Sequence, residues 1–374
     1  MKILILSEVY PSPDNLYAMG FVHSRSLEYG RLGHDVTVLS FAAARSYEFE
    51  GVPVRTEADI RALPDGGMGF DAVLSHAPNV RHHLRFLRDF SALPLLFFLH
   101  GHEVLLTLHH YPAPFAYDRS LHERLSRLAR AAYDPFKLFA FRHFCQHELA
   151  RGRRLGLVFV SEWMQRETIT ASPWIARAQG LPTRVIPNAI NHIFIDGHYA
   201  PPAATAADFI CIRPFDNPKY AIDQVVDWAH QCPEQRFHVF GKGRYFDFNP
   251  APSNLTVFKR FIAQAEIPAL LARYRACAMP TRLDSQGVMS CEMASFGIPL
   301  FTSDIEVTRE VLGGFANVCR LPTGASIADS LRQLPPPLSA DDPVRWRFDG
   351  LRLASKEIEF ATEIAQRPTT ELQL

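Results

Sequence analysis

Short apolar runs that are polar only at their ends constrain the fold of this chain more than any other feature of its sequence. In the first half these runs are 2–7, 35–41, 71–76, 93–101, 156–161 and 183–188. Stretches such as 21–32, in which apolar residues recur about every 3.6 positions, separate them. Strands of a parallel sheet have this composition because helices bury both of their faces. The first half therefore predicts a doubly wound α/β sheet with right-handed crossovers.

The same pattern starts again after a stretch rich in proline and alanine at 197–209, which indicates a second α/β domain. Its strand-like runs are 208–215, 236–243, 255–262, 277–281 and 299–303, and its helix-like runs are 221–232 and 267–276. Prolines at 334–343 end this series, and a last helix-like run covers 344–365. We predict an N-terminal domain at 1–196, a linker at 197–207, a C-terminal domain at 208–343 and a C-terminal helical segment at 344–374. Ligands of such domains bind at the carboxyl ends of the strands.

The composition excludes several classes of protein. Among the 374 residues, 39 Lys and Arg balance 39 Asp and Glu, so no nucleic-acid partner is expected. The six cysteines are scattered without a CxxC pair, which disfavours a zinc site and a disulfide framework. The apolar run at 3–6 is too short for a secretory signal, and the longest run, 92–99, is far below the roughly 20 residues that span a bilayer. We expect a cytoplasmic protein, either soluble or peripheral on the inner face of the cell membrane.

The stretch PTRLDSQGVMSCEMASFGIPL, at 280–300, combines a turn with the start of a helix. LDSQG has the composition of a turn, and helical spacing follows from Gly287 to Gly297, a typical C-cap residue. The unpaired amides of a helix N-terminus attract an anion, and a glycine there lets a ligand approach the backbone. With Asp284 before the helix and Glu292 about one turn into it, the stretch suits a sugar nucleotide, which has hydroxyls at both ends and phosphates in the middle. An ordinary capping arrangement with a solvated Glu292 is the alternative.

This stretch resembles the acid-x7-acid motif of the retaining GT-B glycosyltransferases of family 4, the group 1 type. The family usually has a glutamate at the first position, where this chain has Asp284. Other matches stand in family order over nearly the whole chain: Tyr10-Pro11, Met19-Gly20, RLGHDVTVLS (31–40), SHAPN (75–79), LHGHE (99–103), FVSEWMQ (159–165) and RVIPNAINHIF (184–194). The resemblance implies two Rossmann-like doubly wound domains facing a cleft, with a C-terminal helix that crosses back to the N-terminal domain.

The family holds the diphosphate of its donor with an arginine and a lysine after the first strand of the second domain. Arg213 and Lys219 are the matching residues. A guanidinium fork beside an ammonium suits a pyrophosphate whose charge grows as it leaves. The spacing of the pair is one residue longer than in the family, and Ile212 replaces the usual glycine. A surface arginine and lysine without a ligand are the alternative.

The resemblance also assigns roles to single residues. His100, Arg213, Lys219 and Asp284 form the expected catalytic set, with His100 by the anomeric carbon and Asp284 facing the hydroxyls of the donor sugar. Glu292 is expected to bind the ribose hydroxyls. The remaining donor-binding positions are Gly20, Gly241, Gly243, Gln286, Gly287 and Val288. Three further residues are expected near the acceptor or the donor sugar: His76, His102 and Glu103.

The reaction that the resemblance implies is transfer of a sugar from a nucleotide donor to an acceptor hydroxyl with retention of anomeric configuration. A UDP-sugar is the favoured donor, and the acceptor is a glycan or a lipid-linked saccharide of surface or secreted glycan biosynthesis. In this family the leaving phosphate oxygen is thought to take the acceptor's proton. No metal and no other cofactor are expected.

Two other functions stay open. An isomerase or epimerase of the same fold would convert a nucleotide sugar without an acceptor, and a non-catalytic relative would bind a partner glycosyltransferase. The departures at Asp284 and Arg213 leave room for the second of these. A dehydrogenase is disfavoured because no GxGxxG follows the first strand.

The stretch 119–154 in the first domain is basic, with nine basic and three acidic residues. Leu121, Leu125 and Leu128 recur in it at helical spacing, opposite a series of arginines. A basic amphipathic helix can lie on an anionic membrane surface. The outer face of a core helix and a site for an anionic acceptor are the alternatives.

Overall fold

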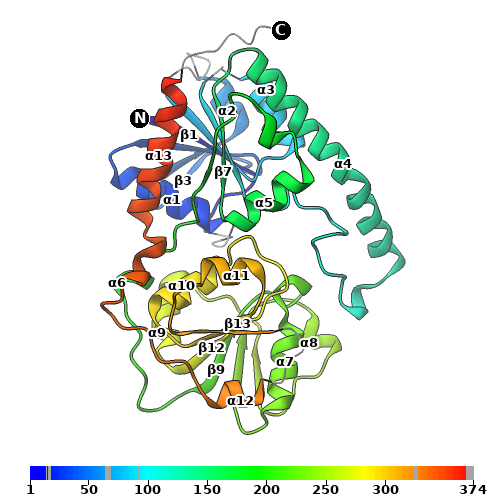
Figure 1. The fold of residues 1–374 in the computed structure, drawn as a ribbon, viewed down its shortest axis with the longest axis vertical. Helices are drawn as coiled ribbons and strands as arrows, with labels where there is room; N and C mark the ends of the chain where they lie inside the picture. The colour runs from blue at the N-terminus through cyan, green and yellow to red at the C-terminus, as the bar shows by residue number, and fades with distance from the viewer. Residues whose placement is uncertain (14, 16–17, 64–68, 91–92, 323–326, 368–374) are drawn as a thin grey trace. The chain divides into compact units, whose positions relative to one another are not determined.

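The computed structural model describes residues 1–374 except 14, 16–17, 64–68, 91–92, 323–326 and 368–374. Its chain forms two compact units (Figure 1). Unit 1 comprises Met1–His109, Ala129–Ala189 and Gly350–Leu374, and unit 2 comprises His110–Leu128 and Ile190–Asp349. The last helix of the chain therefore returns to unit 1, as the resemblance implies.

Unit 1 is built on an eight-stranded sheet with the strand order β3-β4-β2-β1-β5-β6-β7-β8. All neighbours are parallel except β3 and β4, which form an antiparallel hairpin. The strands are Lys2–Ser7 (β1), Asp35–Ser40 (β2), Tyr47–Phe49 (β3), Val52–Arg55 (β4), Ala72–His76 (β5), Leu95–Leu99 (β6), Leu155–Phe159 (β7) and Thr183–Val185 (β8). Strands β5, β6 and β7 are buried at every position, which is expected where helices cover both faces of a sheet. Five of the six strand-like runs predicted in the first half contain one of these strands, and the run 156–161 overlaps β7, which begins one residue earlier.

Helices connect successive strands of this sheet, and the last helix of the chain packs on the same unit. They are Gly20–Arg31 (α1), Glu57–Arg61 (α2), Arg85–Asp89 (α3), Leu121–Ala150 (α4), Glu162–Ala171 (α5) and Gly350–Gln366 (α13), of which α4 begins in the segment that belongs to unit 2. Short π and 3-10 turns stand at Val80–Leu84 (η1), Ala116–Asp118 (η2) and Ile175–Arg177 (η3). The predicted run 344–365 is two elements, because a 3-10 helix at Pro343–Phe348 (η6) precedes α13.

A buried ion pair joins α13 to α1, and Figure 1 shows these two helices side by side. Arg25 Nε donates to a carboxylate oxygen of Glu357 at 2.8 Å, and both side chains are almost fully buried. The hydroxyl of Tyr29 donates to the other oxygen of Glu357 at 2.5 Å. Near the start of α13, a Cβ on Gly350 would come within 2.9 Å of the side chain of Glu28. Close packing and a buried charge pair therefore fix the last helix on unit 1.

Unit 2 is built on a six-stranded parallel sheet with the strand order β11-β10-β9-β12-β13-β14. The strands are Ala207–Ile212 (β9), Phe237–Phe240 (β10), Leu255–Phe258 (β11), Tyr274–Ala278 (β12), Leu300–Ser303 (β13) and Val318–Leu321 (β14). The helices are Ile193–Asp196 (α6), Ile222–Gln231 (α7), Tyr245–Phe248 (α8), Ile267–Leu271 (α9), Val288–Phe296 (α10), Glu306–Val311 (α11) and Ala328–Arg332 (α12). Two 3-10 turns stand at Pro218–Tyr220 (η4) and Gln264–Glu266 (η5). A parallel α/β sheet in each unit confirms the predicted fold class.

The helix predicted over 267–276 is wrong in its second half. Helix α9 ends at Leu271, and strand β12 begins at Tyr274. Tyr274 pairs with Ala207 of β9, and its side chain is buried. Sheet pairing therefore overrides the helical period of the sequence at this point.

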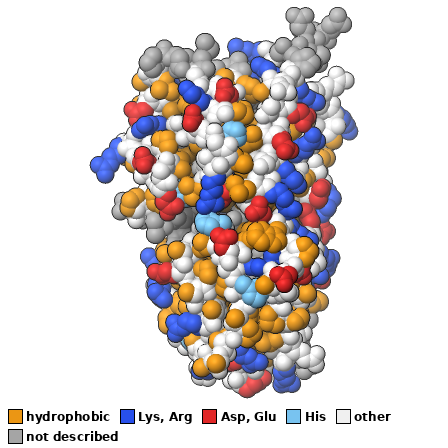
Figure 2. All heavy atoms as spheres, turned by 90° about the vertical axis from the view of Figure 1, so that its left-hand side faces the viewer, with side chains coloured by type: hydrophobic (Ala, Val, Ile, Leu, Met, Phe, Trp, Pro, Cys, Tyr) orange, Lys and Arg blue, Asp and Glu red, His pale blue; other side chains and the backbone are white. Residues whose placement is uncertain are grey.

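The surface carries both signs of charge. Figure 2 shows Lys and Arg side chains interspersed with Asp and Glu on one face of the molecule. This distribution agrees with the zero formal net charge of the sequence. Across the residues that the structure describes, none of the helices combines the length and the apolar character that crossing a membrane requires.

Candidate active site

Two cations of unit 2 contact the same aromatic ring. Arg213 follows β9, and its guanidinium carbon lies 5.3 Å from the centre of the Tyr220 ring. The ammonium of Lys219, in η4, lies 4.6 Å from the same ring centre. Since cations favour the negative face of an aromatic ring, Tyr220 gives each of the two side chains a favourable contact.

Arg213 is only 5% exposed, so little water can solvate its charge. Its Nη2 donates to the carbonyl of Met279 at 3.2 Å and to the hydroxyl of Ser290 at 3.4 Å. Its Nε is buried, and within the described residues it has no hydrogen-bond partner. A buried guanidinium with a spare donor fits an anion that completes the pairing.

The start of α10 lies beside this guanidinium, because Ser290 belongs to its first turn. Gly287 precedes the helix with a φ of 76°, a left-handed conformation that favours glycine. Asp284 shapes the turn, since its carboxylate accepts hydrogen bonds from the amides of Ser285 at 2.9 Å and Gln286 at 3.3 Å. The sequence-based placement of a helix N-terminus at Gly287-Val288 is confirmed, and its amides add to the positive potential at Arg213.

Glu292 lies one turn into α10 and is 2% exposed. Its carboxylate accepts a hydrogen bond of 2.8 Å from the side-chain amide of Gln264. The side-chain oxygen of Gln264 in turn accepts a hydrogen bond of 3.1 Å from the side-chain amide of Asn191. Burial raises the pKa of Glu292 to about 7, although hydrogen bonds from the Asn191 backbone and Gln264 lower it. The carboxylate is buried and hydrogen-bonded, not solvated as the capping alternative requires.

Gly241 and Gly243 allow the loops after β9 and β10 to approach each other. A Cβ on Gly241 would stand 1.9 Å from the carbonyl oxygen of Arg213. Gly243 has a φ of 139°, and a Cβ there would stand 2.8 Å from Asp216. Gly241 therefore packs directly against the backbone of Arg213, and Gly243 packs against Asp216 in the same loop.

In unit 1, His100 follows β6 at the same sheet edge as the start of α1. Its ring lies 4.6 Å from that of Phe21, and Gly20 is the first residue of α1. On the other side, Nε2 of His100 lies 3.2 Å from Nδ1 of His76, the last residue of β5. Burial lowers the pKa of His100 well below its usual range, and the charges of Arg25 and His102 lower it further. The ring is therefore neutral near pH 7.

Glu103 folds its carboxylate back onto the loop after β6. The carboxylate accepts hydrogen bonds from the backbone amides of His100 and Gly101, the second at 3.0 Å. The side chain of Glu103 is buried, whereas the neighbouring His102 side chain is exposed. The structure thus gives Glu103 a part in holding the backbone of His100.

The structure groups the predicted residues by unit. Around α10 of unit 2 it brings together Arg213, Lys219, Asp284, Gln286, Gly287, Val288 and Glu292, and around β6 of unit 1 it brings together Gly20, His76, His100, His102 and Glu103. Sequence reasoning missed Tyr220, Gln264 and Asn191. The aromatic residue directly after Lys219 was a usable signal for Tyr220, whereas no spacing in the sequence links Gln264 to Glu292.

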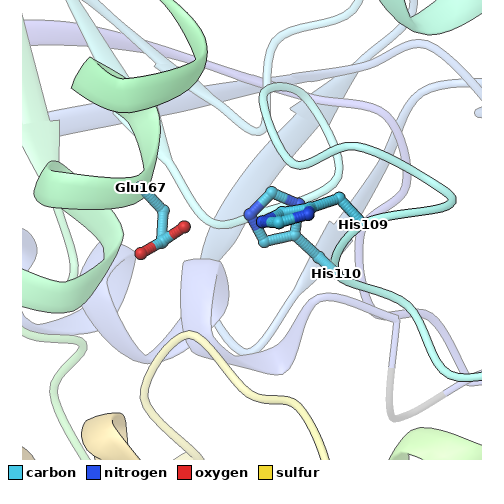
Figure 3. A group of neighbouring side chains, drawn as sticks. All are labelled: His109, His110 and Glu167. Atoms are coloured by element: carbon cyan, nitrogen blue, oxygen red, sulfur yellow. The ribbon is translucent and has the colours of Figure 1, made fainter.

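One group of side chains in the described part of the chain has the spacing of metal ligands (Figure 3). One ligand atom each of His109, His110 and Glu167 lies within 4.8 Å of the others. The histidines are adjacent in a loop and Glu167 is on α5, so the group could not be predicted from a local sequence motif. The expected independence from metal stays a prediction.

Comparison with known proteins supports the fold. No family model and no curated protein matches the sequence. HepE from Anabaena, solved in complex with UDP and glucose, is 15% identical with a TM-score of 0.65 over 97% of this chain and 100% of its own. Sucrose-phosphate synthase from Thermosynechococcus elongatus is 13% identical with a TM-score of 0.62 over 98% and 96%. WaaG, a glycosyltransferase involved in lipopolysaccharide biosynthesis, is 13% identical with a TM-score of 0.53 over 99% and 97%.

These identities are low, but the matches run over almost the full length of both chains. They show that the protein has the GT-B fold of two Rossmann-like units that these structures share, which confirms the fold implied by the sequence motifs.

Proposed function

We propose that the protein transfers a sugar from a nucleotide-sugar donor to an acceptor hydroxyl with retention of anomeric configuration. The observation that carries this proposal is the convergence of Arg213, Lys219 and the start of α10 in unit 2. A buried guanidinium with a spare donor, a second cation and a helix N-terminus together favour a doubly charged anion such as a diphosphate. The GT-B fold supports the proposal because named glycosyltransferases share it.

In this proposal unit 2 holds the donor. The diphosphate lies against Arg213, Lys219 and the first amides of α10, which stabilise the charge that grows as the bond between the anomeric carbon and the phosphate oxygen breaks. That phosphate oxygen takes the proton of the acceptor hydroxyl, and the acceptor oxygen bonds to the anomeric carbon on the face that the diphosphate leaves. Retention follows from this geometry without a protein nucleophile.

Two carboxylates of unit 2 are proposed to bind hydroxyls of the donor. Glu292 accepts hydrogen bonds from the ribose hydroxyls. The bond from Gln264 orients its buried carboxylate and leaves acceptor positions on it for these hydroxyls. Asp284 faces the hydroxyls of the transferred sugar from the turn before α10. In unit 1, His100 serves the anomeric carbon and the acceptor, and Gly20 approaches the diphosphate.

The proposed donor is a UDP-sugar, and the complex of HepE with UDP and glucose supports this choice. The proposed acceptor is a glycan or a lipid-linked saccharide of surface or secreted glycan biosynthesis, which is supported by the involvement of WaaG in lipopolysaccharide biosynthesis.

A thermal-shift screen against UDP-, GDP-, ADP- and dTDP-sugars tests the proposal, because a donor that binds only the folded protein raises the melting temperature. We expect a clear shift with one base. Arg213→Ala should abolish this shift and reduce the rate of transfer by about 100-fold or more. Arg275→Ala is the matched control, since it removes an arginine at the opposite end of the sheet whose ion pair with Asp208 is partly exposed. No shift with any donor contradicts the proposal.

Product analysis separates transfer from epimerisation. Incubation of the responding donor without an acceptor should leave its sugar unchanged or yield only slow hydrolysis. Appearance of an isomeric nucleotide sugar would instead establish the epimerase alternative.

We also propose that helix α4 binds an anionic membrane surface on the cytoplasmic side. The leucines of its first turns face solvent, with exposed fractions of 73% for Leu121 and 57% for Leu125 and for Leu128. Phe136 and Phe139 extend this apolar stripe at helical spacing and are exposed as well. In the outer face of an ordinary core helix, the apolar residues would be packed inward.

Basic side chains accompany the apolar stripe. Those exposed in the stretch 119–154 are Arg119, Arg124, Arg130, Arg142 and Arg151, whereas Arg153 is buried on Glu148. Exposed apolar residues with basic neighbours favour an anionic lipid surface. Flotation with vesicles of phosphatidylglycerol and phosphatidylcholine should recover the protein at low salt, and Leu125→Glu with Phe139→Glu should prevent it. The proposal is contradicted if the double variant floats with the vesicles, or if the original protein does not float with them.

A further inference from the structure

Two histidine rings lie end to end at the carboxyl ends of the neighbouring strands β5 and β6. Nδ1 of His76 is 3.2 Å from Nε2 of His100, which is hydrogen-bond distance. His76 is 0% exposed, and its ring stacks on Phe98 with 4.3 Å between the ring centres. His76 is therefore buried, and its Nδ1 is directed at the ring of His100.

Both rings are neutral near pH 7. Burial lowers the pKa of each histidine well below its usual range, and the positive charge of Arg25 disfavours a proton on either one. A neutral imidazole carries one N–H and one bare nitrogen. The contact between the rings therefore holds a single proton, which belongs either to His76 Nδ1 or to His100 Nε2.

The surroundings of the other nitrogen of His76 decide between these arrangements. Its Nε2 is buried and, among the residues that the structure describes, has no hydrogen-bond partner. If His100 donated, this nitrogen would carry a buried N–H with no acceptor, in the field of the Arg25 cation. If His76 donates from Nδ1, the same nitrogen carries a lone pair, which the cation stabilises.

We propose that His76 is a positioning residue that donates from Nδ1 to His100 and thereby holds His100 in the tautomer with its proton on Nδ1. His100 then presents an N–H at its free nitrogen, as a donor to an oxygen of the donor sugar or the acceptor. This inference rests on the proposed role of His100 and adds the residue that sets its hydrogen-bonding polarity. The carboxylate of Glu103 holds the backbone of His100 through two amides, so the loop and the ring orientation have separate supports.

Two substitutions at position 76 separate the hydrogen bond from packing. His76→Phe keeps a ring of similar size on Phe98 but removes the donor. His76→Asn keeps an N–H donor close to the position of Nδ1. The direct readout is the tautomer of His100, measured by two-bond proton–nitrogen correlation spectra of protein labelled with ¹⁵N-histidine, with the His100 signals assigned from His100→Gln.

We expect the Nδ1–H tautomer of His100 in the original protein and in His76→Asn, and a mixture of tautomers in His76→Phe. A proton on Nε2 of His100 in the original protein, or an unchanged tautomer in His76→Phe, overturns the inference. This measurement needs no enzyme activity, so its failure is distinguishable from failure of the proposed function.

A kinetic split adds a second readout. Loss of one hydrogen bond should lower kcat in His76→Phe by about tenfold with little change in the KM for the donor, and His76→Asn should restore most of the rate. Equal kcat in the two variants would show that the ring acts only through packing. Thermal unfolding of both variants checks that they fold.

Discussion

The side-chain amide of Gln264 donates a hydrogen bond of 2.8 Å to the carboxylate of Glu292, which is buried one turn into α10. Because the carboxylate is almost inaccessible to water, burial raises its pKa to about 7. Its charge state therefore changes within the physiological range. If Glu292 binds ribose hydroxyls, donor binding depends on that change.

The affinity for the nucleotide should rise with pH through about 7, because the ionised form of Glu292 accepts hydrogen bonds from two hydroxyls better than the protonated form does. Isothermal titration calorimetry with UDP measures this affinity. The titrations run between about pH 5.5 and about pH 8.5, which lie about 1.5 units on either side of this pKa. Glu292→Gln should bind more weakly above neutral pH and lose the pH dependence. The same dependence in this variant would assign the titration to another group.

Stability should change in the opposite direction. The folded-state pKa of Glu292 lies above the unfolded value of 4.5, so the folded protein binds more protons between these values. The contribution of Glu292 is fully present below pH 4.5 and is lost as pH rises through about 7. Glu292→Gln should thus gain about 2–4 kcal/mol relative to the original protein between pH 4.5 and 8 in urea unfolding. A constant difference between the two proteins would contradict the shift.

Gln264→Leu should move the pH midpoint of nucleotide binding upward by about one unit, because a hydrogen bond to a charged group stabilises the ionised form by about 1.5 kcal/mol or more. Glu266→Gln, an exposed residue in the same 3-10 turn, is the control and should leave the midpoint unchanged. An unchanged midpoint in Gln264→Leu would mean that Gln264 does not tune the carboxylate.

Two glycines should respond differently to alanine. A Cβ on Gly241 would meet the carbonyl of Arg213 at 1.9 Å, so Gly241→Ala should cost about 2–3 kcal/mol of stability and weaken nucleotide binding. A Cβ on Gly20 meets no atom within 4 Å, so Gly20→Ala should unfold at the same temperature as the original protein. If the diphosphate approaches Gly20, this variant loses donor affinity alone, and full affinity would remove that role.

The ion pair of Arg25 and Glu357 should account for much of the attachment of α13. Glu357→Ala leaves a buried guanidinium without its partner and should lower the stability of unit 1 by about 3–5 kcal/mol. Tyr29→Phe removes only a hydroxyl bonded to the same carboxylate and should cost about 1–2 kcal/mol. Similar losses in both variants would show that the pair contributes little beyond the hydrogen bond.

The sequence predicted correctly the turns and helix ends that depend on residues adjacent in the chain. The turn, the N-terminus at Gly287 and the C-cap at Gly297, with a φ of 100°, follow from residues adjacent in sequence. The hairpin of β3 and β4 was missed although Glu50-Gly51 supplies its turn, with positive φ at both residues. Its first strand, Tyr47–Phe49, has three residues and is too short to show a period.

Features that depend on distant partners could not be predicted from the sequence. Gln264 follows β11 and Glu292 lies on α10, which follows β12. The two side chains meet because parallel strands end on the same side of the sheet. Likewise, the sequence shows that the leucines of α4 share a face, but whether that face is covered depends on what packs against it. The exposure of Leu121 and Leu125 is a property of the folded chain.

A crystal structure of the protein with a bound UDP-sugar tests the central claim most directly. The account predicts the diphosphate within hydrogen-bond distance of the Arg213 guanidinium, the Lys219 ammonium and the first amides of α10, with the ribose hydroxyls on Glu292. A nucleotide bound at any other place, with these four groups untouched, would contradict it.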